Sequence, residues 1–276
     1  MINFPIHLPA FDPVAISLGP IAVRWYSLAY IAGILFGLFW LKKCNEKEQF
    51  LSQKAYDDWL VWITLSVILG GRLGYVLFYN FSYFLSNPLE IFAIWHGGMS
   101  FHGGLVGSIL GMWLFAKKYE VNFWKLIDSC SVAAPVGIFF GRLANFVNLE
   151  LYGRVTQSNF GVIFPGAGNL PRHPSQLYEA FLEGLALFLI LFFLHKSDRF
   201  SKRLGFLSGM FLTLYGSFRM LIENFREPDQ QIGFFQIKFL HEITMGQCLS
   251  LPLIAVGIML IFTSKKPANN GNGERS

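Results

Sequence analysis

The sequence predicts an all-α, polytopic membrane protein with seven transmembrane helices, an external N-terminus and a cytoplasmic C-terminus. Hydrophobic residues make up 53% of the 276 positions and charged residues only 14%, against about 25% charged in ordinary soluble domains. Several apolar segments approach or reach the length of about 20 residues that a helix needs to cross a bilayer. Basic residues, in addition, gather on one side of these segments.

The two longest uncharged runs predict the clearest helices. Gly97–Ala116 contains only His102 as an ionisable group, and Ile243–Ser264 contains no charged residue. We expect residues 1–264 to form one transmembrane domain with short external segments, and residues 265–276 to form a disordered cytoplasmic tail. The remaining predicted spans, which contain more polar residues, are Ile21–Leu41, Trp59–Tyr79, Leu126–Asn148, Leu177–Leu194 and Leu204–Glu223.

Basic residues fix the predicted orientation. Of the 22 Lys and Arg residues, 14 lie after the first, third and fifth spans or in the tail, and the positive-inside rule makes this side cytoplasmic. The net charge of +5 is thereby assigned to loops that face anionic lipid, so we expect no nucleic-acid partner. The 14 residues are Lys42, Lys43, Lys47, Lys54, Lys117, Lys118, Lys125, Lys196, Arg199, Lys202, Arg203, Lys265, Lys266 and Arg275.

Polar side chains inside the spans converge on the external side of the predicted topology. A charged residue near the bilayer centre costs roughly 2.5 to 3.5 kcal/mol, so a cluster of them indicates a functional site. We therefore predict a polar chamber that opens to the outer leaflet. The residues that reach this layer are Arg24, Tyr26, Arg72, His102, Arg142, Asn145, Asn148, His173, Tyr178, Glu179, Tyr215, Arg219 and Glu223.

Helical spacing groups some of these side chains. Tyr215, Arg219, Glu223 and Arg226 recur at steps of four, four and three, which places them on one helix face and allows Arg219 to pair with Glu223. Small residues also recur at steps of four, which predicts close contact between helix backbones. These are Gly33 with Gly37, Gly70 with Gly74, and Gly103 with Gly107 and Gly111.

Some of the charged residues have simpler interpretations. Arg24 and Lys238 are equally well explained as anchors of helix ends at the membrane interface. Arg72 has uncharged neighbours for more than two turns on both sides, which favours an internal partner or an anionic ligand. Glu183 and Asp128 have no matching partner along their helices, so we interpret them as packing or capping groups.

The chemistry of the chamber favours an anion over a metal. A guanidinium matches a phosphate group in shape and keeps its charge when buried. The sequence contains no HExxH pattern and no paired cysteines, and the local charge is cationic, so no metal is expected. His102 is either a hydrogen-bonded structural group or a general base, since its ordinary pKa of about 6.5 suits that role near neutrality.

Five sequence blocks carry a family resemblance, which extends from about Phe11 to Phe262. With these blocks in this order, the chain resembles the bacterial prolipoprotein diacylglyceryl transferases. The blocks are GRLANFVNLELYG at Gly141–Gly153, HGGLVG at His102–Gly107, GGRLGYVLFYN at Gly70–Asn80, RHPSQLYE at Arg172–Glu179 and YGSFRMLIENFREPD at Tyr215–Asp229.

The resemblance implies a membrane-embedded catalytic domain and a specific reaction. The diacylglyceryl group of phosphatidylglycerol would pass to the thiol of the lipobox cysteine in a prolipoprotein signal peptide, with formation of a thioether and release of glycerol phosphate. It also implies a multi-pass protein of the bacterial cytoplasmic (inner) membrane, with its active site toward the periplasmic or external leaflet. Beyond these two substrates and membrane lipid, no cofactor, metal or nucleic acid is expected.

The resemblance and the chemistry of the implied reaction together suggest roles for residues. Arg142 and Arg219 would grip the phosphate and stabilise the leaving group, and His102 would be the base for the thiol. Arg219 offers a competing way to lower the pKa of the thiol, if its pair with Glu223 breaks on binding. The residues expected to bind phosphatidylglycerol are Arg142, Tyr26, Asn145, Asn148, Glu150, Gly153, Tyr215, Glu223 and Arg226.

Two functions of other classes remain as alternatives. An anionic-lipid transporter or flippase would use the arginines as an anion site, but such folds commonly contain internal repeats, and none is evident between the two halves of this chain. A lipid-binding scaffold would not need His102 together with so many arginines.

Overall fold

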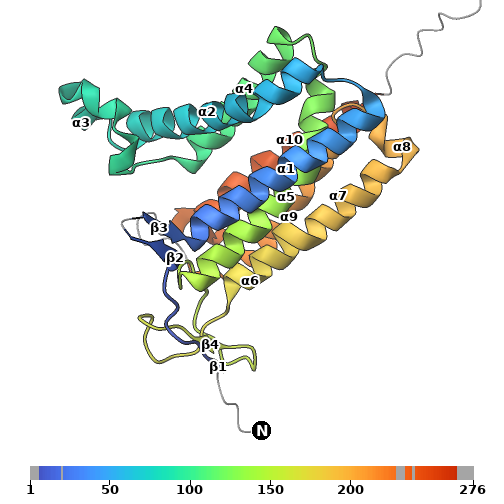
Figure 1. Ribbon diagram of the computed structural model, residues 1–276. Coiled ribbons are helices and arrows are strands. Elements are labelled where there is room, and N and C mark those ends of the chain that lie inside the picture. The colour runs from blue at the N-terminus through green and yellow to red at the C-terminus, as the bar shows by residue number, and fades with distance from the viewer. Residues whose placement is uncertain (1–5, 20, 228–233, 238–239, 266–276) are drawn as a thin grey trace, which may run out of the picture. The chain divides into compact units, whose positions relative to one another are not determined.

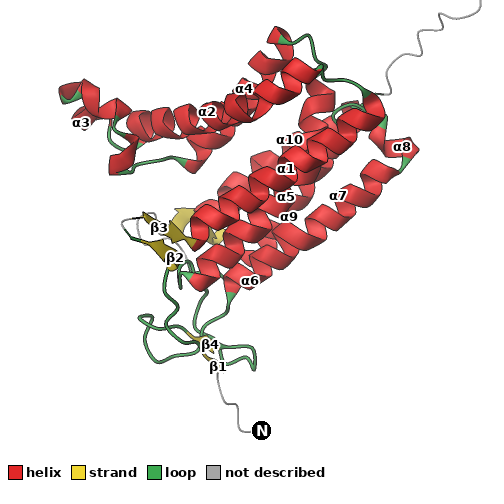
Figure 2. Cartoon of the chain, viewed as in Figure 1, coloured by secondary structure: helices red, strands yellow, loops and turns green. Residues whose placement is uncertain are grey.

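Helices make up most of the chain (Figures 1 and 2). The structure is a computed structural model that describes residues 6–19, 21–227, 234–237 and 240–265. Most of the predicted cytoplasmic tail, from position 266 onward, therefore lies outside the described residues. The chain divides into two compact units, of which the first joins Met1–Trp40 to Cys130–Ser276 and the second is Leu41–Ser129.

The first unit contains the larger set of helices. Near the N-terminus it has three short strands, β1 (Ile6–His7), β2 (Val14–Leu18) and β3 (Ile21–Arg24), which precede α1 (Trp25–Glu48). Helix α1 runs on into the second unit, and α5 (Phe123–Val147) returns from it. The later elements are β4 (Val162–Ile163), α6 (Ser175–Glu179), the π-helix η3 (Ala180–Ala186), α7 (Leu187–Lys196), α8 (Asp198–Ser201), α9 (Phe206–Ile222), β5 (Phe234–Ile237), β6 (Leu240–Thr244) and α10 (Met245–Thr263).

The second unit is an antiparallel pair of helices with a short irregular connection. Helix α2 spans Gln53–Phe78 and α4 spans Phe101–Lys118. Between them lie α3 (Phe81–Ser86) and the 3₁₀ helices η1 (Pro88–Phe92) and η2 (Ile94–His96).

Each of the seven predicted spans falls on a helical segment. Within the described residues, five helices are long and apolar enough to cross a membrane, which supports a multi-pass membrane protein. Helix α9 is apolar but has only 17 residues, and α4 is not among the five. The number of seven spans and the direction of the termini therefore stay predictions. The five helices are Trp25–Glu48, Gln53–Phe78, Phe123–Val147, Ser175–Lys196 and Gly246–Thr263.

Short strands correct the all-α expectation and the predicted start of the first span. Ile21–Arg24 is not helical but pairs with β2 as an antiparallel hairpin, with Leu18 opposite Ile21 and Val14 opposite Arg24. Gly19 adopts φ +61° in the turn, a conformation that glycine tolerates best. Arg24 thus ends a strand directly before α1.

The third span also begins later than predicted. Gly97 and Gly98 have φ values of +82° and +80°, and helix α4 starts only at Phe101. The Ser100 hydroxyl accepts a hydrogen bond from the backbone N–H of Gly103 at 3.1 Å and caps the helix. The uncharged run therefore contained a turn and a cap before the helix, which hydrophobicity alone did not separate.

Glycines let α2 and α4 approach closely, as the spacing predicted. A Cβ atom on Gly70 would lie 2.6 Å from Cα of Gly107, and one on Gly74 would lie 2.6 Å from Cα of Gly103. These distances are too short for any side chain, so the two backbones are in direct contact.

The first glycine pair behaves differently. A Cβ atom on Gly33 of α1 would lie 3.0 Å from Cα of Gly137 in α5. One on Gly37 would meet nothing within 4 Å in the described chain. The close packing predicted at Gly37 is therefore not found among the described residues.

Arg72 is a buried cation of the second unit, and its partners are backbone carbonyls. Its guanidinium lies 5.1 Å from the centre of the Phe84 ring. The prediction of an internal partner for Arg72 is confirmed, although the partners are carbonyl dipoles and not a carboxylate. Arg72 thereby holds η1 and η2 against α2. It donates to the carbonyl oxygens of Ile91 (2.9 Å), Gly97 (2.5 Å), Gly98 (3.1 Å), Glu90 (2.5 Å) and Ala93 (3.3 Å).

We expect Arg72→Gln to destabilise the connection between α2 and α4. Glutamine is too short to reach all five carbonyls, and hydrogen bonds to a charged group contribute about 1.5–3 kcal/mol each, so a loss on the order of 3 kcal/mol is expected. The measurement is the thermal unfolding midpoint in detergent, together with the rate of proteolysis between positions 88 and 98.

Lys54→Gln is the matched control, because Lys54 is an exposed cation on the same helix. It should leave both readouts at wild-type values. Equal midpoints and equal proteolysis for Arg72→Gln and the wild type would contradict the role assigned to Arg72.

Candidate functional site

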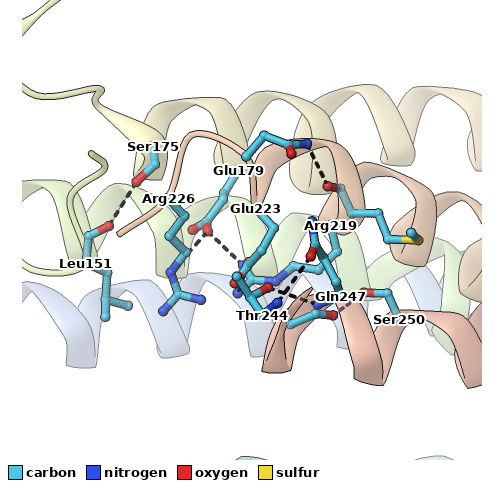
Figure 3. Close-up of polar contacts among 12 residues, drawn as sticks. Leu151, Ser175, Glu179, Arg219, Glu223, Arg226, Thr244, Gln247 and Ser250 are labelled. Atoms are coloured by element: carbon cyan, nitrogen blue, oxygen red, sulfur yellow. Dashed lines mark hydrogen bonds and ion pairs between the residues drawn. The ribbon is translucent and has the colours of Figure 1, made fainter. Parts of the chain in front are cut away.

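Six charged side chains form one ion cluster in the first unit. We call Arg142, Arg219, Arg226, Glu179, Glu183 and Glu223 the central ion cluster. Figure 3 shows Glu179 between Arg226 and Arg219, with Glu223 also turned toward Arg219. These residues come from α5, from the helix formed by α6 and η3, and from α9 and the turn that follows it.

Glu179 bridges two arginines. Its Oε2 lies 3.0 Å from Nε of Arg142, and its Oε1 lies 2.8 Å from Nη1 of Arg219. Oε1 is also 4.0 Å from Nε of Arg226. Glu179 is fully buried, so its charge depends on these cations.

Glu183 corrects an interpretation made from the sequence. It is not a packing group without a partner, because its Oε2 lies 3.3 Å from Nη2 of Arg142 and its Oε1 lies 3.8 Å from Nη1 of Arg219. The cations belong to α5 and α9, so spacing along the helix that carries Glu183 gave no sign of them.

A π-helical segment presents the two buried glutamates. Glu179 is the last residue of α6, and Glu183 lies inside η3. Gly184 follows, and a Cβ atom there would lie 2.7 Å from Cβ of Phe139, so η3 contacts α5 directly. This approach brings Glu183 within reach of Arg142. Single π turns inside helices frequently accompany functional sites.

The pair predicted within α9 is present. Nη2 of Arg219 lies 3.0 Å from Oε2 of Glu223, four residues later. Glu223 is buried and faces the first turn of α10, where a Cβ atom on Gly246 would lie 2.7 Å from its carboxylate carbon. The positive end of the α10 dipole therefore also stabilises this carboxylate.

A second group, which we call the tyrosine cluster, joins Tyr26, Asn145 and Glu150. The hydroxyl of Tyr26 donates to Oε2 of Glu150 at 3.0 Å and accepts a hydrogen bond from Nδ2 of Asn145. Asn145 lies one turn after Arg142 on α5, so the tyrosine cluster adjoins the central ion cluster. All three residues were predicted to bind the lipid head group.

The loop after α5 holds Glu150 in a strained backbone. Leu149 and Leu151 have φ values of +58° and +54°, which side chains with a Cβ rarely adopt. Two side chains at the start of α6 fix this loop: Nε2 of Gln176 donates to the carbonyl of Glu150 at 2.5 Å, and Oγ of Ser175 donates to that of Leu151 at 3.0 Å. Sequence reasoning did not assign either role.

Gly153 and Arg154 tie this loop to the end of α9. A Cβ atom on Gly153 would lie 2.4 Å from the carbonyl oxygen of Phe225, so no larger residue fits. The backbone N–H of Arg154 donates to the same carbonyl at 2.9 Å, and its Nε donates to the carbonyl of Arg226 at 2.8 Å. Arg226 is thus positioned by the loop that follows α5.

The remaining predicted residues differ in how far the structure describes them. Tyr215 stacks on Phe211 and lies within electrostatic range of the central ion cluster. Asn148 lies in the turn that ends α5, and its buried Oδ1 accepts no hydrogen bond from the described atoms. His102 belongs to α4 in the second unit, and its side chain is outside the described part of the chain. Its role as a base therefore stays a prediction.

Beside this site, burial lowers the pKa of His173, which precedes α6. Its ring packs against Phe225, and its Nδ1 lies 3.2 Å from the hydroxyl of Tyr178. The histidine is therefore neutral near pH 7 and serves to pack the loop against α9.

Comparisons with known proteins identify the family of this chain. A family model described as prolipoprotein diacylglyceryl transferase matches residues 13–263. A protein of Rickettsia conorii named phosphatidylglycerol–prolipoprotein diacylglyceryl transferase is 49% identical over 257 residues, which cover 93% of this chain and 98% of that protein. A protein of Brucella canis with the same name is 48% identical over 270 residues, covering 95% of each chain. The chain therefore belongs to the prolipoprotein diacylglyceryl transferase family.

Proposed function

We propose that this protein transfers the diacylglyceryl group of phosphatidylglycerol to the lipobox cysteine of prolipoprotein signal peptides. The observation that carries the proposal is the pair of arginines, Arg142 and Arg219, held by buried glutamates in a bundle of apolar helices. This pair suits the phosphate of a membrane lipid. The names of relatives that are nearly half identical to the chain support the same substrates.

The step itself is a displacement at carbon. The cysteine sulfur forms a C–S bond to the diacylglyceryl carbon while the C–O bond to the phosphate breaks, and the electron pair leaves with glycerol phosphate. The thiol proton passes to a base, for which we propose His102. Arg142 and Arg219 stabilise the growing negative charge on the phosphate.

Asn145, Tyr26 and Glu150 suit the glycerol part of the head group. They form a hydrogen-bonded chain that offers both donors and acceptors beside Arg142. Asn148, Gly153, Tyr215, Glu223 and Arg226 complete the proposed substrate site by positioning the loop and the arginines.

The proposed setting is the bacterial inner membrane, with seven spans, an external N-terminus and a cytoplasmic C-terminus. Five helices of sufficient length and the distribution of Lys and Arg support it. In this orientation the central ion cluster faces the periplasmic or external leaflet, where translocated signal peptides are accessible.

The purified protein should transfer diacylglycerol from phosphatidylglycerol to a lipobox peptide, and the arginines should be required. Arg142→Lys keeps the charge but loses the planar donors, so we expect kcat/KM to fall about 100-fold. The double variant Arg142→Ala with Arg219→Ala should have no measurable activity. Thioether formation is measured by mass spectrometry, with gel filtration as the check on folding.

Arg199→Ala is the control, since Arg199 is exposed on α8. Wild-type transfer by a folded Arg142→Lys protein would remove the phosphate role. A wild-type protein that moves phosphatidylglycerol between leaflets but forms no thioether would instead be a transporter.

We expect His102→Gln to change the pH dependence of the rate. A histidine base must be neutral, so the wild-type rate should fall below about pH 6.5 and this acidic limb should be absent in the variant. The measurement is kcat/KM as a function of pH, from about pH 5 to about pH 9. A variant profile parallel to that of the wild type would assign His102 to structure.

We expect Gly246→Ala to displace Glu223. The new methyl group would meet the carboxylate, so the pair with Arg219 must open, and misplaced groups of this kind lower rates on the order of tenfold or more. Gly37→Ala makes the same change where a Cβ atom meets nothing within 4 Å of the described chain. Equal kcat/KM for the two variants would show that the position of Glu223 is unimportant.

A further inference from the structure

The central ion cluster has no surplus positive charge. It contains three arginines and three glutamates, joined by contacts of 2.8 to 4.0 Å. Glu179 and Glu183 are fully buried, and Glu223 and Arg226 are nearly so. An anionic head group that enters this neutral cluster would add an uncompensated charge in a medium of low dielectric constant, which is strongly unfavourable.

Of the two glutamates that bridge Arg142 and Arg219, Glu183 makes the longer contacts. Its oxygens lie 3.3 Å from Nη2 of Arg142 and 3.8 Å from Nη1 of Arg219. The oxygens of Glu179 lie 3.0 Å and 2.8 Å from nitrogens of the same two side chains. Glu223 pairs with Arg219, and the first turn of α10 also stabilises its charge. Neutralising Glu183 therefore costs less ion-pair energy than neutralising Glu179, and it releases both Arg142 and Arg219, which neutralising Glu223 would not.

The surroundings of Glu183 also favour this choice. Arg142 faces it from α5, Arg219 and Tyr215 face it from α9, and Glu179 faces it from its own helix. If Glu183 becomes neutral, Arg142 and Arg219 each lose one of their carboxylate partners. Their guanidinium groups can then turn toward a phosphate without leaving a buried charge unpaired.

We infer that the protein binds an anionic phospholipid together with one proton from solvent, and that Glu183 carries this proton. The proton joins Oε1 of Glu183 when the lipid phosphate pairs with the arginines, and it returns to solvent when the anionic product leaves. This inference rests on the proposed function, since it takes the phosphate of phosphatidylglycerol as the ligand. Glu183 acts here through charge balance and does not react with the substrate.

The first test measures proton uptake by the wild-type protein in detergent. Phosphatidylglycerol is titrated calorimetrically in two phosphate-free buffers that differ in ionisation enthalpy, with diacylglycerol as the uncharged control lipid. We expect an uptake approaching one proton per phosphatidylglycerol and none with diacylglycerol. The lipid phosphodiester keeps a single charge at neutral pH, so any proton taken up belongs to the protein.

The affinity should follow the same coupling. Because Glu183 is ionised in the free protein and protonated in the complex, the Kd for phosphatidylglycerol should rise about tenfold for each unit of increasing pH within the coupled range. Glu183→Gln resembles the protonated form, so its Kd should stay constant with pH and should match or improve on the wild-type value at pH 9. If Glu183 had a purely structural role, Glu183→Gln would instead weaken the binding of phosphatidylglycerol at every pH.

Glu46→Gln is the matched control, because Glu46 is exposed on α1 and should keep both the uptake and the slope. The infrared difference spectrum identifies the proton carrier, and it also decides should Glu183→Gln fail to fold. Lipid binding should create a carboxylic-acid band in the wild type. Glu183→Asp should shift this band, whereas Glu223→Asp, which keeps the charge at position 223, should leave it in place.

The inference is overturned if the wild type binds phosphatidylglycerol without taking up a proton. It is also overturned if the uptake survives in Glu183→Gln, or if Glu223→Asp rather than Glu183→Asp shifts the carboxylic-acid band. A wild-type protein that transfers diacylglycerol without proton uptake would contradict only this inference and would leave the proposed function intact. A wild type that binds no phosphatidylglycerol at any pH would overturn the proposed function as well.

Discussion

The first unit of this molecule depends on the mutual neutralisation of charges that are buried among apolar helices. Arg142 and Arg219 lie on predominantly apolar helices, and a lone arginine there would be costly. Glu179 and Glu183 make this placement possible by approaching both guanidinium groups from a third helix. The ion pairs therefore fix α5, α9 and the α6–η3 segment against one another, while glycines such as Gly184 set how closely they pack.

Arg72 shows that burial of an arginine does not by itself make an anion site. Its guanidinium is surrounded by backbone carbonyls, which carry no net charge and do not take up a proton near neutral pH. The guanidinium groups of Arg142 and Arg219 instead face carboxylates, whose charge can be exchanged for that of a ligand. The structural role of Arg72 and the phosphate role proposed for Arg142 and Arg219 thus differ in the partner of each arginine, and a sequence does not show that partner.

Sequence reasoning succeeded where the determining contacts are local or repeated. Arg219 and Glu223 are four residues apart, and Gly70 with Gly74 repeats the spacing of Gly103 with Gly107, so these contacts could be predicted. The length of the apolar segments, which is also a local property of the sequence, located the long helices. Position 183 was misjudged because its partners are 41 and 36 residues away in the chain, on other helices.

Helix boundaries failed for a different physical reason. Hydrophobicity reports the tendency to leave water, and it does not separate an apolar strand or turn from an apolar helix. Ile21–Arg24 is as apolar as the helix it precedes, yet it pairs with β2. The strained residues Leu149 and Leu151 gave no signal either, because leucine usually favours helices.

The irregular loop after α5 explains why the polar stretch Gly141–Arg154 extends beyond the end of that helix. Its helical part supplies Arg142 and Asn145, and its non-helical part supplies the contacts that hold the neighbouring helix end. The backbone of Gly153 pairs with that of Arg226, and Arg154 donates to the carbonyls of Phe225 and Arg226. Because the ion cluster is assembled from separate helices, the positions of its side chains depend on how the ends of those helices are held. The loop after α5 therefore serves the same site as the helix before it, by fixing Arg226 beside Glu179.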